Sequence, residues 1–148
     1  MMDSLDKVKA LGRAELFQGI EQETLEEIAK ASRIEEFEEG DVLYSLGDDA
    51  EDVYVLVSGR VRFTLGVANR GETSGSIMSG RMVFGWAALV DDQPRRVATA
   101  ECLEDSVVVA IGGAGLKAAL ERHPPSGFIV MRRLAAMIAR NFMDMGSN

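Results

Sequence analysis

The hydrophobic period changes twice along this chain, and this change constrains the fold more than any other feature. Residues 33–111 carry short apolar segments separated by turns such as Gly40-Asp41, Gly47-Asp48 and Ser58-Gly59, whereas the segments before and after follow helical spacing. Short strands at regular spacing with glycine turns are typical of a small antiparallel barrel or jelly roll. We therefore expect a mainly β fold with flanking helices.

The N-terminal half is predicted to pass from helix to strand. Residues 1–32 are expected to be helical, including a helix over Glu21–Ala31. Val53–Val57 and Arg60–Leu65, joined by a serine-glycine turn, are predicted to form a β-hairpin. Val67–Ser76 is polar and rich in glycine, which predicts a loop.

The C-terminal part returns to helical spacing. Ala114–Arg122 predicts a short helix, and His123-Pro124-Pro125 is expected to end it because proline cannot continue a helix. Ser126 is expected to cap a last helix from Gly127 to about Met145.

Length and charge exclude several classes of protein. The 148 residues correspond to about one domain, which we divide into helical residues 1–32, barrel residues 33–112 and C-terminal helices 113–145. Lys and Arg number 16 against 24 Asp and Glu, a net charge of −8. Such a chain lacks the electrostatic footprint of a general nucleic-acid binder and is repelled by an anionic membrane surface. With no apolar segment long enough to span a membrane and no signal-peptide core, it is expected to be cytoplasmic.

Only one cysteine and one histidine are present, and this limits the chemistry. Cys102 cannot form an intrachain disulfide, and His123 alone cannot build a site of several histidines. We therefore expect no metal, no cofactor and no enzymatic activity. Cys102 is expected in the core, and His123 at the end of a helix.

The segment most informative about function is Phe84-Gly85-Trp86-Ala87, followed by Arg95 and Arg96. A short helical turn after Gly85 would direct backbone N–H groups outward, where they form a nest for an anion. A guanidinium matches phosphate oxygens, so this combination inside a small barrel predicts a phosphate site for a small ligand. A plainer interpretation also fits, in which Phe84 and Ala87 are core residues and Arg95-Arg96 is a solvated surface pair.

Several segments carry a family resemblance. They are F-E-E-G-D-V-L-Y at 37–44, V-Y-V-L-V-S-G at 53–59, Phe84-Gly85, Pro94-Arg95-Arg96 and Glu104-Asp105-Ser106. Through them, about residues 15–142 resemble the cyclic nucleotide-binding domain, the family of the catabolite activator protein and the regulatory subunits of cAMP-dependent protein kinase. The resemblance implies an antiparallel jelly-roll barrel (double-stranded β-helix) with N-terminal helices and a C-terminal helical lid.

The resemblance also implies a phosphate cassette that binds a cyclic nucleotide such as cAMP or cGMP, or a related small anion. The ligand-binding residues that it implies are Phe84, Gly85, Trp86, Ala87, Arg95, Arg96, Val97 and Ala98. Counting forward from Trp86 selects Arg95 as the phosphate-binding arginine. Counting back from Ala98-Thr99 selects Arg96, which we favour because the downstream strand sets its register by core alternation.

Trp86 departs from the family pattern, which has a glutamate that holds the ribose 2′-hydroxyl. A carboxylate accepts a charge-assisted hydrogen bond of about 1.5–3 kcal/mol, whereas an indole offers one donor and no acceptor. Cyclic nucleotide binding is therefore expected to be weaker by about one to two powers of ten. Val97 replaces a hydroxyl residue and removes a further hydrogen bond. The F-G-W-A-A-L-V pattern is similar to that of single-domain bacterial proteins of this superfamily, in which the tryptophan either reshapes the pocket for another ligand or fills it.

The last helix is expected to mediate assembly. Its 3-4 spaced residues fit a helix-pairing seam: Met131, Leu134, Ile138, Asn141 and Met145. The resemblance implies that this helix covers the ligand and forms a homodimer, although one stripe could also simply pack on the barrel. No helix-turn-helix follows up to Asn148, so we expect the output to pass through a partner protein or a rearranged dimer.

Three functions from different classes follow. The favoured one is a regulatory ligand-sensing domain that binds beside Gly85 and Arg96 and signals through the C-terminal helix. The alternative is a degenerate domain that binds no nucleotide, has Trp86 and Val97 in its pocket and acts as a dimeric protein-interaction module. A metal-dependent enzyme of the cupin type, built on a similar barrel, is disfavoured because its sites need several histidines.

Overall fold

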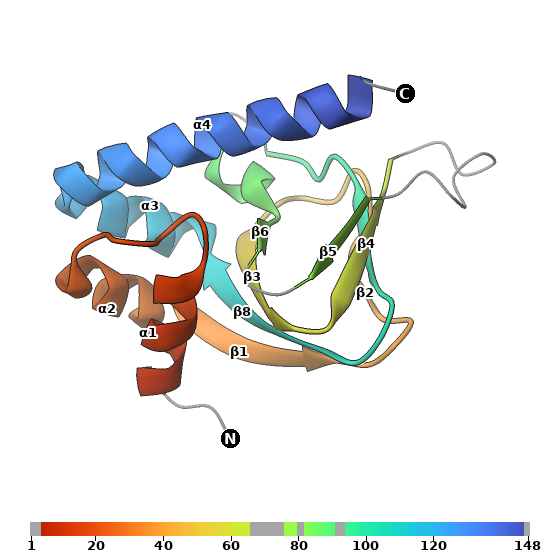
Figure 1. Cartoon of the computed structure of the whole chain (residues 1–148), viewed down its shortest axis with the longest axis horizontal. Helices are drawn as coiled ribbons and strands as arrows, with labels where there is room; N and C mark the ends of the chain where they lie inside the picture. The colour runs from red at the N-terminus through yellow and green to blue at the C-terminus, as the bar shows by residue number, and fades with distance from the viewer. Residues whose placement is uncertain (1–3, 66–75, 80–81, 91–93, 147–148) are drawn as a thin grey trace.

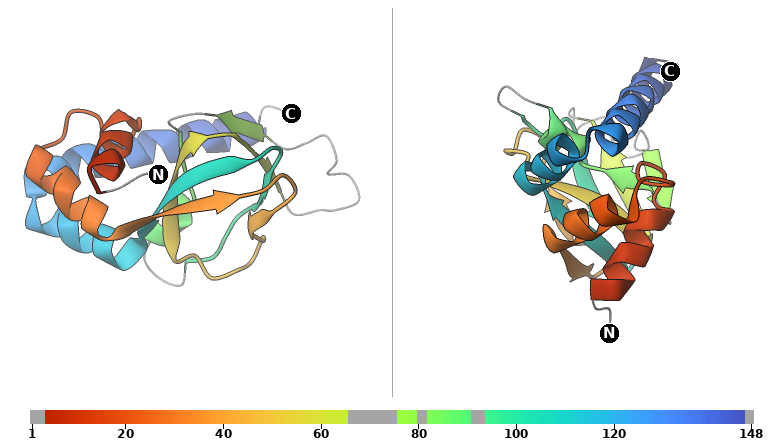
Figure 2. Two further views of the ribbon diagram at one scale, coloured as in Figure 1. Left: turned by 90° about the horizontal axis from the view of Figure 1, so that it is seen from below. Right: turned by 90° about the vertical axis from the view of Figure 1, so that its left-hand side faces the viewer.

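The computed structural model describes residues 4–65, 76–79, 82–90 and 94–146. Within them, helices gather at one end of the molecule and strands at the other (Figure 1, Figure 2). The C-terminal helix α4 runs from the helical end across the strands. The predicted order of helices, strands and helices is therefore confirmed.

The N-terminal helices are α1 (Ser4–Arg13) and α2 (Gln22–Lys30). The helix predicted over Glu21–Ala31 is confirmed, because α2 lies within it. Leu25 and Ile28 of α2 are buried, and its acidic residues lie on the opposite face. This amphipathic pattern fixes the side of α2 that packs on the core.

Among the described residues, eight strands form two antiparallel four-stranded sheets. The first sheet has the order β1-β8-β3-β6, with β1 Ser32–Phe37, β8 Ser106–Gly112, β3 Asp52–Ser58 and β6 Val83–Phe84. The second has the order β2-β7-β4-β5, with β2 Val42–Tyr44, β7 Thr99–Cys102, β4 Arg60–Thr64 and β5 Ser76–Ser79. Apart from β4 and β5, which pair with each other, consecutive strands lie in different sheets, which is the jelly-roll arrangement that the sequence predicts.

The hairpin predicted around Ser58-Gly59 is wrong. The two strands exist, but β3 pairs with β6 and β8, whereas β4 pairs with β5 and β7. The turn is therefore a corner that carries the chain from one sheet to the other. Gly59 has φ +102°, and a Cβ there would lie 2.7 Å from the Cα of Ser106, so the corner requires glycine.

The first sheet separates two hydrophobic cores. Tyr54 and Leu56 of β3 point between the sheets, while Val53 and Val55 point toward the helices. Because both faces of β3 are covered, its sequence is continuously apolar, whereas β4 of the second sheet alternates. We call the residues between the sheets the barrel core: Tyr54, Leu56, Val61, Phe84, Ala100, Cys102, Val108 and Ala110, with Phe37, Leu43, Tyr44 and Phe63 packed against them. Cys102 is buried there, as predicted.

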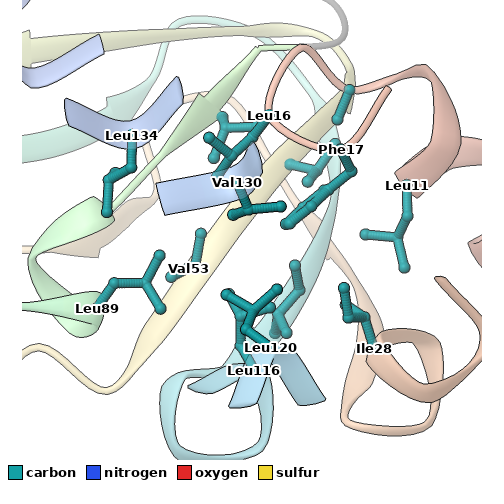
Figure 3. Packing of buried hydrophobic residues seen from close by; sticks show 14 of the residues in the cluster. Leu11, Leu16, Phe17, Ile28, Val53, Leu89, Leu116, Leu120, Val130 and Leu134 are labelled. Atoms are coloured by element: carbon teal, nitrogen blue, oxygen red, sulfur yellow. The ribbon is translucent and has the colours of Figure 1, made fainter. Parts of the chain in front are cut away.

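The helical core lies between the first sheet and the helices (Figure 3). Its members include Leu11, Leu16, Phe17, Ile28, Val53, Leu89, Leu116, Leu120, Val130 and Leu134. Contributions from α1, α2, β3 and α4 meet in this one cluster, so a shift of α4 disturbs packing shared by both ends of the chain.

The C-terminal helices are α3 (Gly113–Arg122) and α4 (Pro124–Gly146). The short helix over Ala114–Arg122 is confirmed, but the cap predicted at Ser126 is wrong because α4 already begins at Pro124. Proline is tolerated in the first turn of a helix, because backbone N–H groups there have no acceptor within the helix and because the fixed φ of proline is helical.

The predicted loop and the expected lack of a membrane-spanning segment can be compared only with the residues that the structure describes. The loop predicted over Val67–Ser76 lies outside them up to residue 75, and Ser76 begins β5. Across 4–65, 76–79, 82–90 and 94–146, no helix has the length and apolarity that a membrane crossing requires.

Candidate anion site at Arg96

Arg96 is held by a turn far from it in the sequence. Its N–H donates to the carbonyl of Asp48 at 2.8 Å, and its carbonyl accepts from the N–H of Gly47 at 2.9 Å. These two bonds fix the backbone so that neighbouring side chains point in opposite directions. Arg96 points inward and is 4% exposed, whereas the side chain of Arg95 is 64% exposed.

The guanidinium of Arg96 binds backbone oxygens. Nη1 donates to the carbonyl of Gly85 at 3.0 Å, and Nη2 donates to the carbonyl of Asp52 at 2.8 Å. Nε is buried without a hydrogen-bond partner. A guanidinium has five N–H groups, so these two bonds satisfy only part of its donor capacity.

No carboxylate of the described residues forms an ion pair with Arg96. Asp52 supplies only its carbonyl, because its carboxylate makes a two-pronged contact with Arg33, at 2.8 Å to Nη2 and 3.4 Å to Nη1. A buried cation normally has an opposite charge beside it, since desolvation otherwise costs several kcal/mol.

Aromatic rings surround the Arg96 guanidinium instead. Its Cζ lies 4.0 Å from the ring centroid of Tyr44 and 5.7 Å from that of Tyr54. Tyr54 in turn stacks on Phe84 at 5.1 Å. Burial raises the pKa of Tyr44 well above its usual value, so the phenol is neutral at physiological pH and cannot be a counter-ion.

Gly85 forms the other wall of the site. It has φ +76°, and a Cβ there would lie 2.9 Å from Nη1 of Arg96 and 3.0 Å from Cδ2 of Tyr54. The following residues form a 3₁₀ turn, η2 (Trp86–Leu89). The short helical turn predicted after Gly85 is therefore present, and the glycine allows the buried guanidinium to approach it closely.

A comparison with families of known sequence now identifies the chain. The family model described as "Cyclic nucleotide-binding domain" matches residues 34–123. The chain belongs to the cyclic nucleotide-binding domain family.

The chain is also similar to a curated transcriptional regulator. It is 24% identical over 130 residues to the CRP-like cAMP-activated global transcriptional regulator of Mycobacterium tuberculosis, covering 88% of this chain and 58% of that protein. The chain thus spans little more than half the length of this relative.

Solved structures show the same fold. The sensor domain of the transcriptional regulator DNR from Pseudomonas aeruginosa superposes with a TM-score of 0.78 at 20% identity, covering 94% of this chain and 93% of that one. The catabolite activator protein of Thermus thermophilus superposes with a TM-score of 0.70 at 25% identity, covering 87% of this chain and 58% of that one.

The structure separates the predicted ligand-binding residues into two groups. Phe84, Gly85 and Arg96 lie together at the end of the barrel core, and Ala98 is buried. Arg95 instead points outward, donates to the carbonyl of Gly47 at 3.2 Å and lies 3.5 Å from Asp49.

Trp86, Ala87 and Val97 do not enter the barrel core. Trp86 is partly buried and packs against the helical core, and Ala87 belongs to that cluster. Val97 is 51% exposed. The expectation that Trp86 and Val97 fill the pocket is therefore wrong, because the turn after Gly85 directs Trp86 toward the helices.

Sequence reasoning missed Tyr44 and Tyr54. Both lie on strands, where an aromatic residue is ordinary, and neither is near Arg96 in the sequence. The one available signal in the sequence is that tyrosine is rare, with two in the whole chain. In the structure, both tyrosine rings face Arg96.

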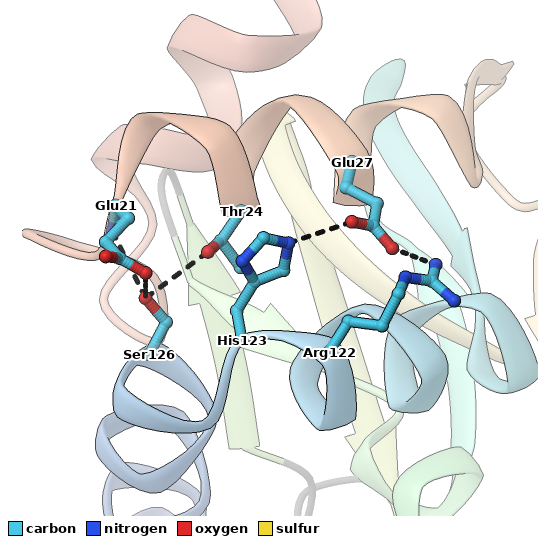
Figure 4. Close-up of polar contacts among 6 residues, drawn as sticks. All are labelled: Glu21, Thr24, Glu27, Arg122, His123 and Ser126. Atoms are coloured by element: carbon cyan, nitrogen blue, oxygen red, sulfur yellow. Dashed lines mark hydrogen bonds and ion pairs between the residues drawn. The ribbon is translucent and has the colours of Figure 1, made fainter.

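A second charged cluster joins α2 to the start of α4 (Figure 4). The carboxylate of Glu27 accepts from Arg122, and its other oxygen lies 2.9 Å from Nε2 of His123. The predicted place of His123 at a helix end is confirmed, because it follows the last residue of α3.

Ser126 continues this junction (Figure 4). Its buried hydroxyl accepts from the N–H of Glu21 at 3.2 Å and lies 3.4 Å from Oγ1 of Thr24. One and two heptads further along α4, Arg133 donates to the carbonyl of Gln18 at 2.6 Å and Arg140 lies 3.8 Å from Glu15. The N-terminal segment thus holds α4 along one stripe.

The pairing seam predicted on α4 needs correction. Leu134 is 4% exposed in the helical core, so it cannot face a partner. Met131 of the predicted seam is 44% exposed, and Phe128, which was predicted on the adjacent stripe, is 66% exposed. The side chains of Asn141 and Met145 lie outside the described part of the chain.

Metal chemistry finds no support in the described ranges. They contain no group of three or more His, Cys, Asp and Glu side chains able to hold a metal ion.

Proposed function

We propose that this chain is a regulatory, non-enzymatic domain that binds a cyclic nucleotide, cAMP or cGMP, or a related small anion at Gly85 and Arg96. Binding is transmitted through α4, and two copies associate through the exposed face of that helix. Membership of the cyclic nucleotide-binding domain family supports the ligand class.

The observation that carries the proposal is the buried charge of Arg96. Arg96 is 4% exposed, and its Nε has no hydrogen-bond partner. Among the described residues, its guanidinium meets carbonyl oxygens and ring faces. An anion supplies the missing opposite charge through charge-assisted hydrogen bonds, which are about twice as strong as neutral ones. Because Arg96 is covered, the ligand reaches it only when a covering segment moves.

Transmission to α4 is supported by the packing of η2. Trp86 packs against the helical core, and Ala87 and Leu89 belong to it together with Val130 and Leu134 of α4. Cores are close-packed, so a displacement of η2 at the ligand is passed to α4. The ligand then shifts the population between two positions of this helix.

Association through α4 is supported by its two apolar faces. One face is buried in the helical core, and the other exposes Phe128 and Met131. An Asp substitution at Met131 is expected to convert a homodimer into a monomer, as measured by analytical ultracentrifugation, while leaving the fold intact. Ala114 is exposed and lies on α3, so Ala114→Asp adds the same single negative charge outside α4 and serves as the control.

The test of ligand binding is a thermal-shift titration with cAMP, cGMP and inorganic phosphate. A ligand at about 100 times its dissociation constant stabilises the folded state by about 2.7 kcal/mol. For a domain of this size, the expected rise in melting temperature is about 5–10 °C.

Two neighbouring arginines provide a matched pair of variants. Arg96→Gln is expected to abolish the shift, and Arg95→Gln is expected to preserve it, because Arg95 points into solvent. Circular dichroism verifies that both variants fold. If neither cyclic nucleotide shifts the wild-type protein at millimolar concentration, the alternative of a degenerate, dimeric interaction module replaces the proposal.

A further inference from the structure

We infer that Tyr44 is the positioning residue for Arg96: its ring face holds the guanidinium in the orientation that receives an anion. This inference rests on the proposed function and deepens it. The two carbonyl contacts, to Gly85 and Asp52, hold the edges of the guanidinium. The ring of Tyr44, 4.0 Å from Cζ, covers its face.

The ring also replaces part of the missing counter-charge. A cation over an aromatic face is attracted by the negative potential of the ring, most strongly where water is excluded. Arg96 is buried and has no carboxylate partner among the described residues, so its charge is stabilised by ring faces and carbonyl oxygens. Unlike a carboxylate, a ring face does not neutralise the arginine, so the cation still attracts an anion once the covering segment has moved.

One short segment carries both the ring and the backbone support. Tyr44 ends β2, and the turn after it supplies the carbonyl of Asp48 and the N–H of Gly47 that hold the backbone of Arg96. The N–H of Leu46 in the same turn donates to Oγ1 of Thr99 at 2.9 Å. Arg96 is therefore positioned in its backbone and its side chain by residues 44–48.

Tyr54 does not share this role. Its centroid is 5.7 Å from Cζ of Arg96, and its ring stacks on Phe84 with an interplanar angle of 16°. Tyr54 thus packs against Gly85 and Phe84, while Tyr44 makes the closer contact with the cation.

The test compares three variants by titration calorimetry with the cyclic nucleotide that gives the largest thermal shift. Tyr44→Phe keeps the ring and is expected to bind within about twofold of the wild type. Tyr44→Leu removes the ring face and is expected to bind about tenfold more weakly. Phe63→Leu is the matched control, because Phe63 packs in the same aromatic cluster but contacts Phe84. It is expected to bind within about twofold of the wild type.

A second readout separates this inference from the proposed function. In the ligand-free protein, ring current from Tyr44 is expected to shift the Nε–H resonance of Arg96, assigned by its loss in Arg96→Lys. The shift is expected to persist in Tyr44→Phe and Phe63→Leu and to disappear in Tyr44→Leu.

The two failures are distinguishable. A wild-type protein that binds no cyclic nucleotide but keeps the ring-current shift overturns the proposed function alone. Equal affinities of Tyr44→Leu and Phe63→Leu, or an unchanged Arg96 resonance in Tyr44→Leu, overturn the positioning role.

Discussion

Two arginines of this molecule meet opposite environments. Arg122, at the junction of α3 and α4, is 62% exposed in its side chain and pairs with the carboxylate of Glu27. Arg96, at the end of the barrel core, is 4% exposed and meets two carbonyls and two rings, with no carboxylate among the described residues. The first charge is balanced inside the chain, and we propose that a ligand balances the second.

This difference separates a structural charge from a functional one. An exposed ion pair contributes about 0–1 kcal/mol to stability and needs nothing further. A buried cation without an opposite charge beside it is costly to the folded protein. The comparison supports the proposal that Arg96 binds an anion, whereas the Glu27 junction attaches α2 to the C-terminal helices.

The largest expected effect is on ligand affinity. Arg96→Gln is expected to weaken cyclic nucleotide binding by about 100-fold, because it removes charge-assisted hydrogen bonds worth about 1.5–3 kcal/mol each. Arg122→Gln removes the same charge and is expected to bind within about twofold of the wild type. Titration calorimetry measures the affinity of both variants. Equal losses of affinity would contradict the distinction between a ligand-binding Arg96 and a structural Arg122.

A smaller effect is expected on the free energy of unfolding at alkaline pH. Burial raises the pKa of Tyr44 above its usual value of 10.0, and that of Tyr54 is also raised by burial. Above pH 10 the unfolded state therefore binds fewer protons than the folded state, so the free energy of unfolding falls as pH rises, by up to about 1.4 kcal/mol per pH unit for each tyrosine.

Urea denaturation between pH 9 and pH 11 measures this loss. Tyr44→Phe is expected to reduce the slope, because it removes one of the two titrating groups. Glu27→Gln, which changes only the junction, is expected to leave it unchanged. A slope that is the same in Tyr44→Phe as in the wild type would show that the ring is not buried in solution.

The smallest expected effect is on the stability of the junction. Glu27→Gln removes the partner of Arg122 and His123 and is expected to lower the free energy of unfolding by about 1 kcal/mol. Glu26→Gln, one residue away on the exposed face of α2, is expected to change it by less than about 0.5 kcal/mol. Urea denaturation at neutral pH distinguishes the two, and ligand affinity is expected to be unchanged in both.

Local pattern predicted the elements of the fold better than their pairing. The apolar run at Val53–Val57 and the alternation at Arg60–Leu65 indicated strands, and both are present, the second as Arg60–Thr64. The same pattern could not show that these strands belong to different sheets, because pairing depends on contacts far apart in the sequence. The steric requirement at Gly59 appears only when Ser106 is brought against it.

The residues of the candidate site also divide into those that local sequence predicts and those that only the fold brings together. Gly85 and Arg96 were predicted from their own segment, because a glycine before a short helical turn and an arginine that follows it are local signals. Tyr44 and Asp52 reach Arg96 only through folding, and no local pattern marks them. The direction of Trp86 was also hidden, because it depends on how η2 turns toward α4.

The most direct measurement follows the side-chain resonances of Arg96 and Arg122 by NMR while cAMP is added. The account predicts that Nε–H of Arg96 moves saturably as it gains an acceptor, while the resonance of Arg122 stays in place. Two results would contradict the proposed anion site. In one, the Arg122 resonance moves when cAMP saturates the protein. In the other, the Arg96 resonance stays unchanged although cAMP stabilises the protein.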